Sequence, residues 1–84
     1  MDTEYTYIKG VLGYNSSNDR YGLLACDLWE IDGFHCGDTL DVWDYDSEQW
    51  IPTRIEKHFQ GDWYLVGTEY SGLSLEGLRA RVRI

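Results

Sequence analysis

The chain has 84 residues, a length that supports one domain with a modest hydrophobic core. Its seven Lys and Arg face fifteen Asp and Glu, so the formal net charge is -8. This charge repels phosphate backbones and disfavours nucleic acid as the default partner. The four Trp and seven Tyr give a composition typical of a folded domain and exclude a disordered chain.

The N-terminus carries Asp2 and Glu4 where a secretory signal needs cations. No apolar run approaches the roughly 18 residues that a membrane span requires. We therefore expect a cytoplasmic protein without a membrane segment. In that reducing compartment Cys26 and Cys36 are expected to be free thiols, although an even number of cysteines leaves a disulfide open.

Clusters of Gly, Asn, Asp and Ser divide the chain into short segments rich in Val, Ile, Thr, Tyr and Trp, a pattern typical of an all-β protein. Nothing in the sequence marks a linker, so we predict a single domain over 1–84. Residues 1–36 are predicted to form an N-terminal hairpin with a covering loop. Residues 37–84 are predicted to form the main set of strands.

In the first half, residues 4–12 and 20–26 are predicted to pair as a hairpin across a polar loop. The following segment, 27–37, is too apolar to be a solvated loop. We interpret it as an anchored loop that covers the barrel and adds, with the hairpin, a layer to it. Its large apolar side chains are Leu28, Trp29, Ile31 and Phe34.

In the second half, residues 39–45 alternate as a strand, with Leu40 and Val42 on the face expected to enter the core. Residues 50–58 alternate in the same way. Pro52 lies within them and lacks an N–H, which indicates an edge position, a strand start or a bulge.

The last third of the chain begins with an apolar run, 63–67, that suits a strand buried on both faces. Residues 73–78 are typical of one helical or 3-10 turn. The chain then ends in a strict alternation of apolar residues with Arg79, Arg81 and Arg83.

Three meandering strands, one helical turn and a final strand make the strand order of a small SH3-like barrel, in which the last strand pairs with the first of the set. The predicted fold is therefore an all-β SH3-like barrel with an N-terminal hairpin and one short helical turn before the last strand. The pairing places the arginines across from the outward residues of 39–45, where charge pairing and cation–π contacts are expected. These outward residues are Asp41, Trp43 and Tyr45.

Four stretches together resemble a small bacterial family catalogued as a domain of unknown function, over nearly the whole chain. They are 37–42, Trp50 with Ile55 and Glu56, 63–66, and 75–82. The resemblance implies a short single-domain protein of bacterial genomes, often linked to mobile elements. It brings no catalytic residue, cofactor or ligand, because the matched positions are mainly Gly, Trp and aliphatic residues.

Candidate reactive residues gather around Cys26, His35 and Cys36, with Asp32 and Asp38 nearby. Their spacing does not match a zinc finger, and the surrounding carboxylates oppose formation of a reactive thiolate. We therefore predict no metal, no cofactor and no enzymatic activity.

The acids of the turn 44–48 alternate like the first half of a calcium loop, but the central Gly and the terminal Glu are missing, so a solvated turn is favoured. The same region combines Trp43, Tyr45 and Trp50 with Asp44, Asp46 and Glu48. Exposed aromatics flanked by acids bind peptides in SH3-like barrels.

We hypothesise that this surface makes the protein a binding module for a basic or proline-containing segment. Packing of each aromatic ring against the N-terminal hairpin is the open alternative.

A second hypothesis is a nucleic-acid-associated accessory protein of a mobile element, acting through Arg79, Arg81 and Arg83 or through acidic mimicry of a duplex. Three phosphate contacts give little affinity at physiological salt, so a protein partner is favoured. The sequence leaves the oligomeric state open.

Overall fold

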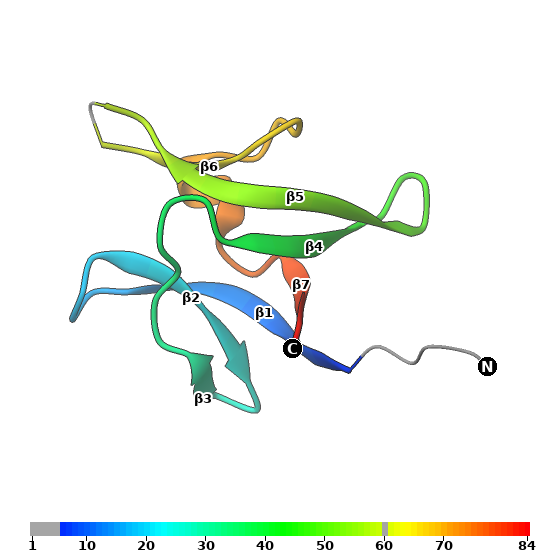
Figure 1. The fold of residues 1–84 in the computed structure, drawn as a ribbon, viewed down its shortest axis with the longest axis horizontal. Helices are drawn as coiled ribbons and strands as arrows, with labels where there is room; N and C mark the ends of the chain where they lie inside the picture. Colours follow the sequence, from blue (N-terminus) through cyan, green and yellow to red (C-terminus); the bar gives the residue numbers. More distant parts are fainter. Residues whose placement is uncertain (1–5, 60) are drawn as a thin grey trace.

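The computed structural model describes residues 6–59 and 61–84, which form one curled sheet of seven antiparallel strands (Figure 1). In chain order the elements are β1 (Tyr7–Asn15), β2 (Arg20–Ala25), β3 (Leu28–Ile31), β4 (Thr39–Asp44), β5 (Gln49–Lys57), β6 (Trp63–Leu65), the 3-10 helix η1 (Gly72–Leu75) and β7 (Arg79–Arg83). The predicted all-β fold, with its N-terminal hairpin and one helical turn before the last strand, is confirmed, and the half-barrel fits the SH3-like pattern.

The last strand, β7, lies in the middle of the sheet and holds its two halves together. It pairs with β1 along one edge and with β4 along the other, in the order β3-β2-β1-β7-β4-β5-β6. The predicted pairing of the last strand with the first strand of the second half is confirmed. The N-terminal hairpin is not a separate layer, because the second edge of β7 is free to continue the same sheet into β1 and β2.

The inner faces of the strands form one core, which includes the predicted Leu40 and Val42. The run 63–67 is not the predicted strand buried on both faces, because only Trp63–Leu65 is a strand. Trp63 and Leu65 are buried, Tyr64 and Val66 are half-buried and Gly67 is exposed. At the centre of the sheet Ala80 of β7 pairs with Gly10 of β1, where a Cβ would clash with the backbone carbonyl of Leu24. Small residues at this point let the sheet curl tightly. The buried core residues are Leu12, Tyr21, Leu23, Phe34, Leu40, Val42, Ile55, Trp63, Leu65, Leu75 and Ala80.

The segment 27–37 differs from the predicted covering loop, because its first half is the edge strand β3, paired with β2. Cys26 and Asp27 both have positive φ, 53° and 63°, as a two-residue type I′ hairpin turn requires. This turn carries none of the usual Asn-Gly chemistry, so its sequence gives no hairpin signal.

The aromatic residues of this segment have separate roles. The Trp29 indole lies against Gly13 and Gly22 on the outer face of the hairpin, where two residues without side chains leave room for it. Trp29 stays 39% exposed, whereas Phe34 is buried and its N–H donates to the Tyr21 carbonyl. Phe34 is therefore the residue of the segment that enters the core.

Pro52 occupies an open edge, as one of its predicted alternatives required. Strand β6 pairs with β5 from Ile55 onward, so the part of β5 that contains Pro52 pairs with β4 alone. Ile55 exchanges hydrogen bonds with the β4 side while the Arg54 carbonyl accepts one from Val66 on the other side. Because strand residues alternate, the backbone nitrogen of Pro52, like the Arg54 carbonyl, faces away from β4. At this open edge the absent N–H costs no hydrogen bond of the sheet, and it hinders the addition of another strand.

Within the residues that the structure describes, no helix has the length and apolar character needed to cross a lipid bilayer.

Two leucines give a matched test of this core. Leu65 is fully buried and Leu73 is 88% exposed. We expect Leu65→Ala to lower the free energy of unfolding by about 2–5 kcal/mol, since it leaves a cavity, and Leu73→Ala to change it by less than about 0.5 kcal/mol. Urea denaturation followed by tryptophan fluorescence measures both, and equal losses would contradict the described core.

Candidate functional site

The two predicted tryptophans face each other across β4 and β5. Trp43 pairs with Trp50, and their rings meet edge to face with centroids 5.3 Å apart at 71°. Both are half-buried. The guanidinium of Arg79 lies 5.5 Å from the Trp43 ring centroid, and that of Arg81 lies 4.5 Å from the Trp50 ring centroid. The tryptophans therefore already contact cations of their own chain.

Arg81 joins this cluster to β1. Its guanidinium lies 3.9 Å from the Tyr7 ring centroid, and its Nε donates a hydrogen bond of 2.8 Å to Asp41. The predicted charge pairing and cation–π contacts across β4 and β7 are confirmed for Asp41 and Trp43. We call this cluster the cation–π seam, defined by Tyr7, Asp41, Trp43, Trp50, Arg79 and Arg81.

The remaining predicted site residues lie on the β4–β5 turn, beyond the seam. Tyr45 is 63% exposed, and Asp46 and Glu48 are exposed as well. Asp44 accepts hydrogen bonds from the Ser47 hydroxyl and the Asp46 N–H, which lower the pKa of its carboxyl because they stabilise the charged form. The structure thus separates the predicted set into two half-buried tryptophans and an exposed acidic turn.

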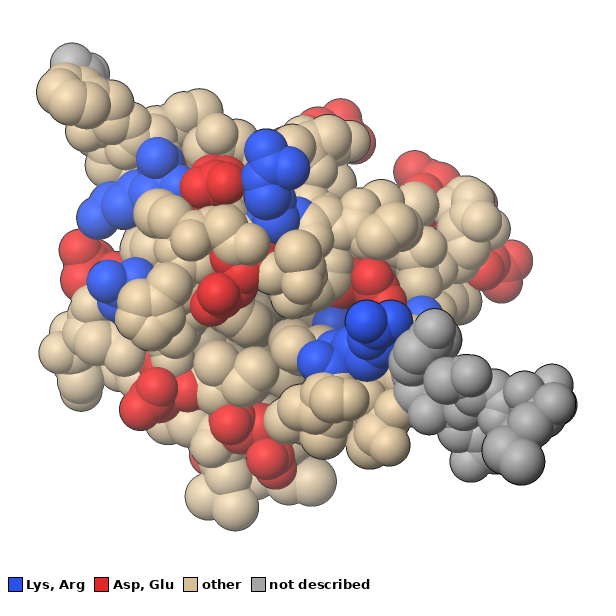
Figure 2. Space-filling model, viewed as in Figure 1, with Lys and Arg blue, Asp and Glu red and all other residues tan. Residues whose placement is uncertain are grey.

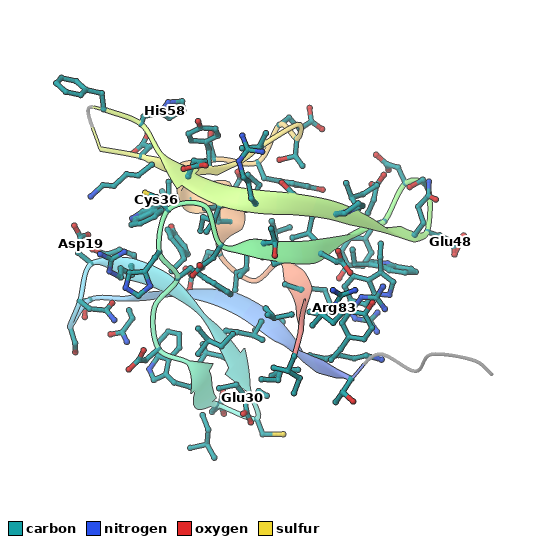
Figure 3. All side chains as sticks on the ribbon, in the orientation of Figure 1. Asp19, Glu30, Cys36, Glu48, His58 and Arg83 are labelled. Carbon is teal, nitrogen blue, oxygen red and sulfur yellow. The ribbon has the colours of Figure 1, made fainter. Side chains whose placement is uncertain are left out.

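A second surface of aromatic and acidic residues lies at the other end of the molecule. Figure 3 shows Asp19, on the β1–β2 turn, and Glu48, on the β4–β5 turn, at opposite ends of the sheet. Around Asp19 a groove of about 230 Å³ lies between the hairpin, the β5–β6 turn and η1. We call it the tyrosine groove, and its side chains include Tyr14, Asp19, Tyr21, Asp62, Trp63 and Leu73.

Hydrogen bonds between distant segments hold this groove. The Tyr21 hydroxyl donates to the Gly72 carbonyl at 3.0 Å, and the Trp63 indole N–H donates to the Asp19 carbonyl at 3.3 Å. The Tyr14 and Tyr21 rings meet edge to face at 5.4 Å. The hairpin, the turn and η1 are therefore fixed relative to one another, and the groove is preformed.

Carboxylates and cations both border the tyrosine groove: Asp19 and Asp62 line it, and Arg20 and Lys57 lie 5.7 and 5.3 Å from the ring centroid of Trp63. The Tyr14 hydroxyl donates to the Asp19 carboxylate, and this hydrogen bond is the main cause of the raised pKa of Tyr14. The pKa of Tyr21 is also raised, first by burial and then by the charges of Glu76 and Asp62. On the face shown in Figure 2, Asp and Glu are scattered widely, whereas Lys and Arg stand in a few separate groups.

Sequence reasoning assigned these residues to separate strands and turns and missed the groove. One local signal was present, because Tyr14 and Tyr21 flank the first polar loop and form a cross-strand pair in the hairpin. Asp62 and Leu73 gave no such signal. They join the tyrosines through the packing of β6 and η1 against the hairpin.

The candidate metal residues do not converge. Cys26 and Cys36 are exposed free thiols, and the described residues contain no group of three or more His, Cys, Asp or Glu that could hold a metal ion. The His35 Nδ1 lies 3.9 Å from the Asp38 carboxylate at the surface. His58 stacks on Tyr64, with ring centroids 4.0 Å apart.

Comparison with known proteins agrees with the fold. Residues 10–82 match the family model described as Domain of unknown function (DUF5348). The chain belongs to this family. The crystal structure of a Ruminococcus gnavus protein, a structural genomics target, is 36% identical and superimposes with a TM-score of 0.71, covering 89% of this chain and 100% of that one. No curated protein matches the chain. The resemblance to a domain of unknown function is confirmed.

The seam gives one prediction about this DUF5348 domain. Lys at position 81 keeps the charge but loses the planar fork and the ring stacking, so we expect Arg81→Lys to lower the free energy of unfolding by about 1–2 kcal/mol. Arg54→Lys is the matched control, because Arg54 pairs with Glu56 at an exposed site, and should cost less than about 0.5 kcal/mol. Equal effects in urea denaturation would contradict the role of the seam.

The tyrosine groove gives a prediction about pH. Both tyrosines hold their protons more tightly in the folded state, so the free energy of unfolding should fall as the pH rises through the ordinary tyrosine pKa of 10.0. Asp19→Asn should move the pKa of Tyr14 toward 10.0 and leave that of Tyr21 nearly unchanged, and Asp46→Asn should move neither. NMR titration of ring-labelled tyrosine measures this. An unchanged pKa of Tyr14 in Asp19→Asn would refute the hydrogen bond between Tyr14 and Asp19.

Proposed function

We propose that this DUF5348 domain is a non-enzymatic binding module that takes a basic or proline-containing segment of a partner protein in the tyrosine groove. The observation that carries the proposal is one groove in which the exposed ring of Tyr14 and the ring of Tyr21 lie with the carboxylates of Asp19 and Asp62. Electron-rich rings beside carboxylates attract cationic side chains.

The apolar part of the groove suits a proline. Tyr14 is 43% exposed and Leu73 is 88% exposed, and both line the groove with the more deeply buried Tyr21 and Trp63. A polyproline segment has no internal hydrogen bonds and a preformed shape, so it docks on aromatic rings at little entropic cost.

The acidic part of the groove suits a Lys or Arg next to that proline. Asp62 forms no ion pair with any residue that the structure describes. Asp19 pairs with Lys57 at 3.8 Å, in an exposed contact that contributes little to stability and can be exchanged for a cation of the ligand. Glu76 accepts the Tyr14 N–H and adds a third negative charge.

The β4–β5 turn is a second surface of the same chemical type, with Tyr45 between Asp44 and Asp46. It is less suited to a proline ring, because the rings of Trp43 and Trp50 are in contact with Arg79 and Arg81. We therefore assign the segment to the tyrosine groove and use the turn as the comparison.

Titration of the 15N-labelled domain with a peptide of alternating Pro and Arg should shift the amide signals of Tyr14, Asp62 and Leu73. Asp62→Asn should weaken the affinity about fivefold, which corresponds to about 1 kcal/mol for one lost charge contact. Asp46→Asn is the matched control on the other surface and should leave the affinity unchanged.

Three outcomes would contradict the proposal. Shifts confined to residues 44–48, with weakening by Asp46→Asn, would assign the segment to the turn. No shifts at millimolar peptide would reject binding of this class. Tighter binding of a 12-nucleotide oligothymidine than of the peptide would favour the nucleic-acid hypothesis.

A further inference from the structure

A further groove lies beside the cation–π seam. Its volume is about 500 Å³, and it lies between the β2–β3 turn, β1, β7 and the edge of Trp50. We call it the cationic groove, because two cations and one carboxylate border it. The residues that define it here are Lys9, Val11, Leu24, Cys26, Asp27, Trp50 and Arg79. It stands at the opposite end of β2 from the tyrosine groove.

Lys9 and Arg79 place two positive charges in this groove. Lys9 pairs with Arg81 and Val11 pairs with Arg79, so Lys9 and Arg79 are diagonal neighbours on one face of β1 and β7. Diagonal neighbours in an antiparallel pair are about 7–8 Å apart, within reach of one another for long side chains. A single carboxylate, or two carboxylates close together, can therefore contact both.

These two cations have no carboxylate partner in the described part of the chain, although the protein carries fifteen acids. Arg54, Lys57 and Arg81 each form an ion pair with a carboxylate. Arg79 contacts the rings of Trp43 and Trp50, and Lys9 has neither an ion pair nor a ring contact. Arg20 also has no ion pair with a described carboxylate, but it donates to the Phe34 carbonyl and lies over the Trp63 ring. Lys9 and Arg79 thus place two cations without an ion pair in one groove, against the single carboxylate of Asp27.

The rest of the groove is apolar. Val11 is 39% exposed although it lies on a strand, and Leu24, its cross-strand partner, is half-buried. The Trp50 ring closes the side toward β5. An apolar side chain of a ligand would bury this surface, which gains about 25 cal/mol for each Å² removed from water.

We propose that the cationic groove binds an acidic segment of a partner protein, with a carboxylate held between Lys9 and Arg79 and a neighbouring aliphatic or aromatic side chain on Val11 and Leu24. The two charges and the apolar surface between them match these two parts of the ligand.

A nucleic acid fits the groove less well. The rings of Trp43 and Trp50 contact each other and the guanidinium groups of Arg79 and Arg81, so bases have no free ring on which to stack. Two phosphate contacts give little affinity at physiological salt, and the net charge of -8 opposes a polyanion over longer distances.

The two thiols give a direct test with an internal control. Cys26 lines the cationic groove, Cys36 lines none of the described pockets, and both are exposed. The probe is a synthetic peptide, Asp-Leu-Asp-Phe-Glu with blocked ends, and the readout is the rate of iodoacetamide alkylation of each cysteine by mass spectrometry. At a peptide concentration of about four times Kd, alkylation of Cys26 should slow about fivefold while that of Cys36 stays constant.

Charge variants locate the carboxylate contact. Lys9→Gln removes a cation that has no ion pair and no ring contact with the described residues, and Arg79→Gln removes the other cation. Each variant should therefore bind the peptide about fivefold more weakly. Arg54→Gln, a cation outside the groove, is the matched control and should leave protection unchanged. Near-ultraviolet circular dichroism checks that Arg79→Gln keeps the tryptophan pair packed.

Several results would overturn the proposal. These are no protection at millimolar peptide, equal protection of both cysteines, or protection that survives Lys9→Gln. Equal protection by a Lys-Leu-Lys-Phe-Lys peptide would show that charge plays no part. Protection by oligothymidine in place of the peptide would assign the groove to nucleic acid. Protection that grows with protein concentration alone would assign it to a second copy of the chain. The proposal does not depend on the tyrosine groove, so either can fail without the other.

Discussion

The placement of the Arg81 guanidinium is the interaction on which the rest of the structure depends. It lies against rings from β1 and β5 and donates to Asp41 of β4, so it joins four strands through one planar cation. The side chains of Arg81 and Asp41 are 21% and 22% exposed, and a charged hydrogen bond is worth more there than at an open surface. At this end of the sheet the guanidinium joins the hairpin to the second half, as the hydrogen bonds of Tyr21 and Trp63 do at the other end.

The same seam decides how the remaining charge is distributed. Asp41 neutralises Arg81, while Arg79 lies over tryptophan rings and Lys9 has no partner in the described chain. An acidic protein thus has two cations and one carboxylate in a groove at one end of β2, and two carboxylates in an aromatic groove at the other. Since charges further apart than about 8–10 Å are screened at physiological salt, each groove responds to its own charges more than to the net charge. Opposite ligand chemistries can therefore coexist on one small sheet.

Much of the second half follows from local pattern. Leu40 and Val42 alternate with outward residues, and the chain ends in an alternation that suits a strand, so the sequence predicts both strands and the face each buries. The edge position of Pro52 could also be predicted as one alternative, because proline lacks an N–H and is tolerated where no neighbouring strand needs that donor. The segment 27–37 was predicted less well. Its turn at Cys26 and Asp27 adopts positive φ without the Asn-Gly pair that is typical of such turns. Trp29 packs against glycines of two other strands, a contact that the local sequence does not indicate.

The sequence by itself determined the all-β class and the outward arginines of the final strand, because both depend on alternation and turn chemistry along the chain. The strand order of the second half came from analogy with the element order of SH3-like barrels. The tertiary structure decided which aromatic residues stay available to a ligand. Trp43 and Trp50 look equivalent to Tyr14 and Tyr21 as sequence, yet β7 brings arginines onto the first pair, while β6 and η1 bring Asp62 and Leu73 to the second. Contacts between segments so far apart in the chain produce no periodic pattern in the sequence, so they can be found only from the folded structure.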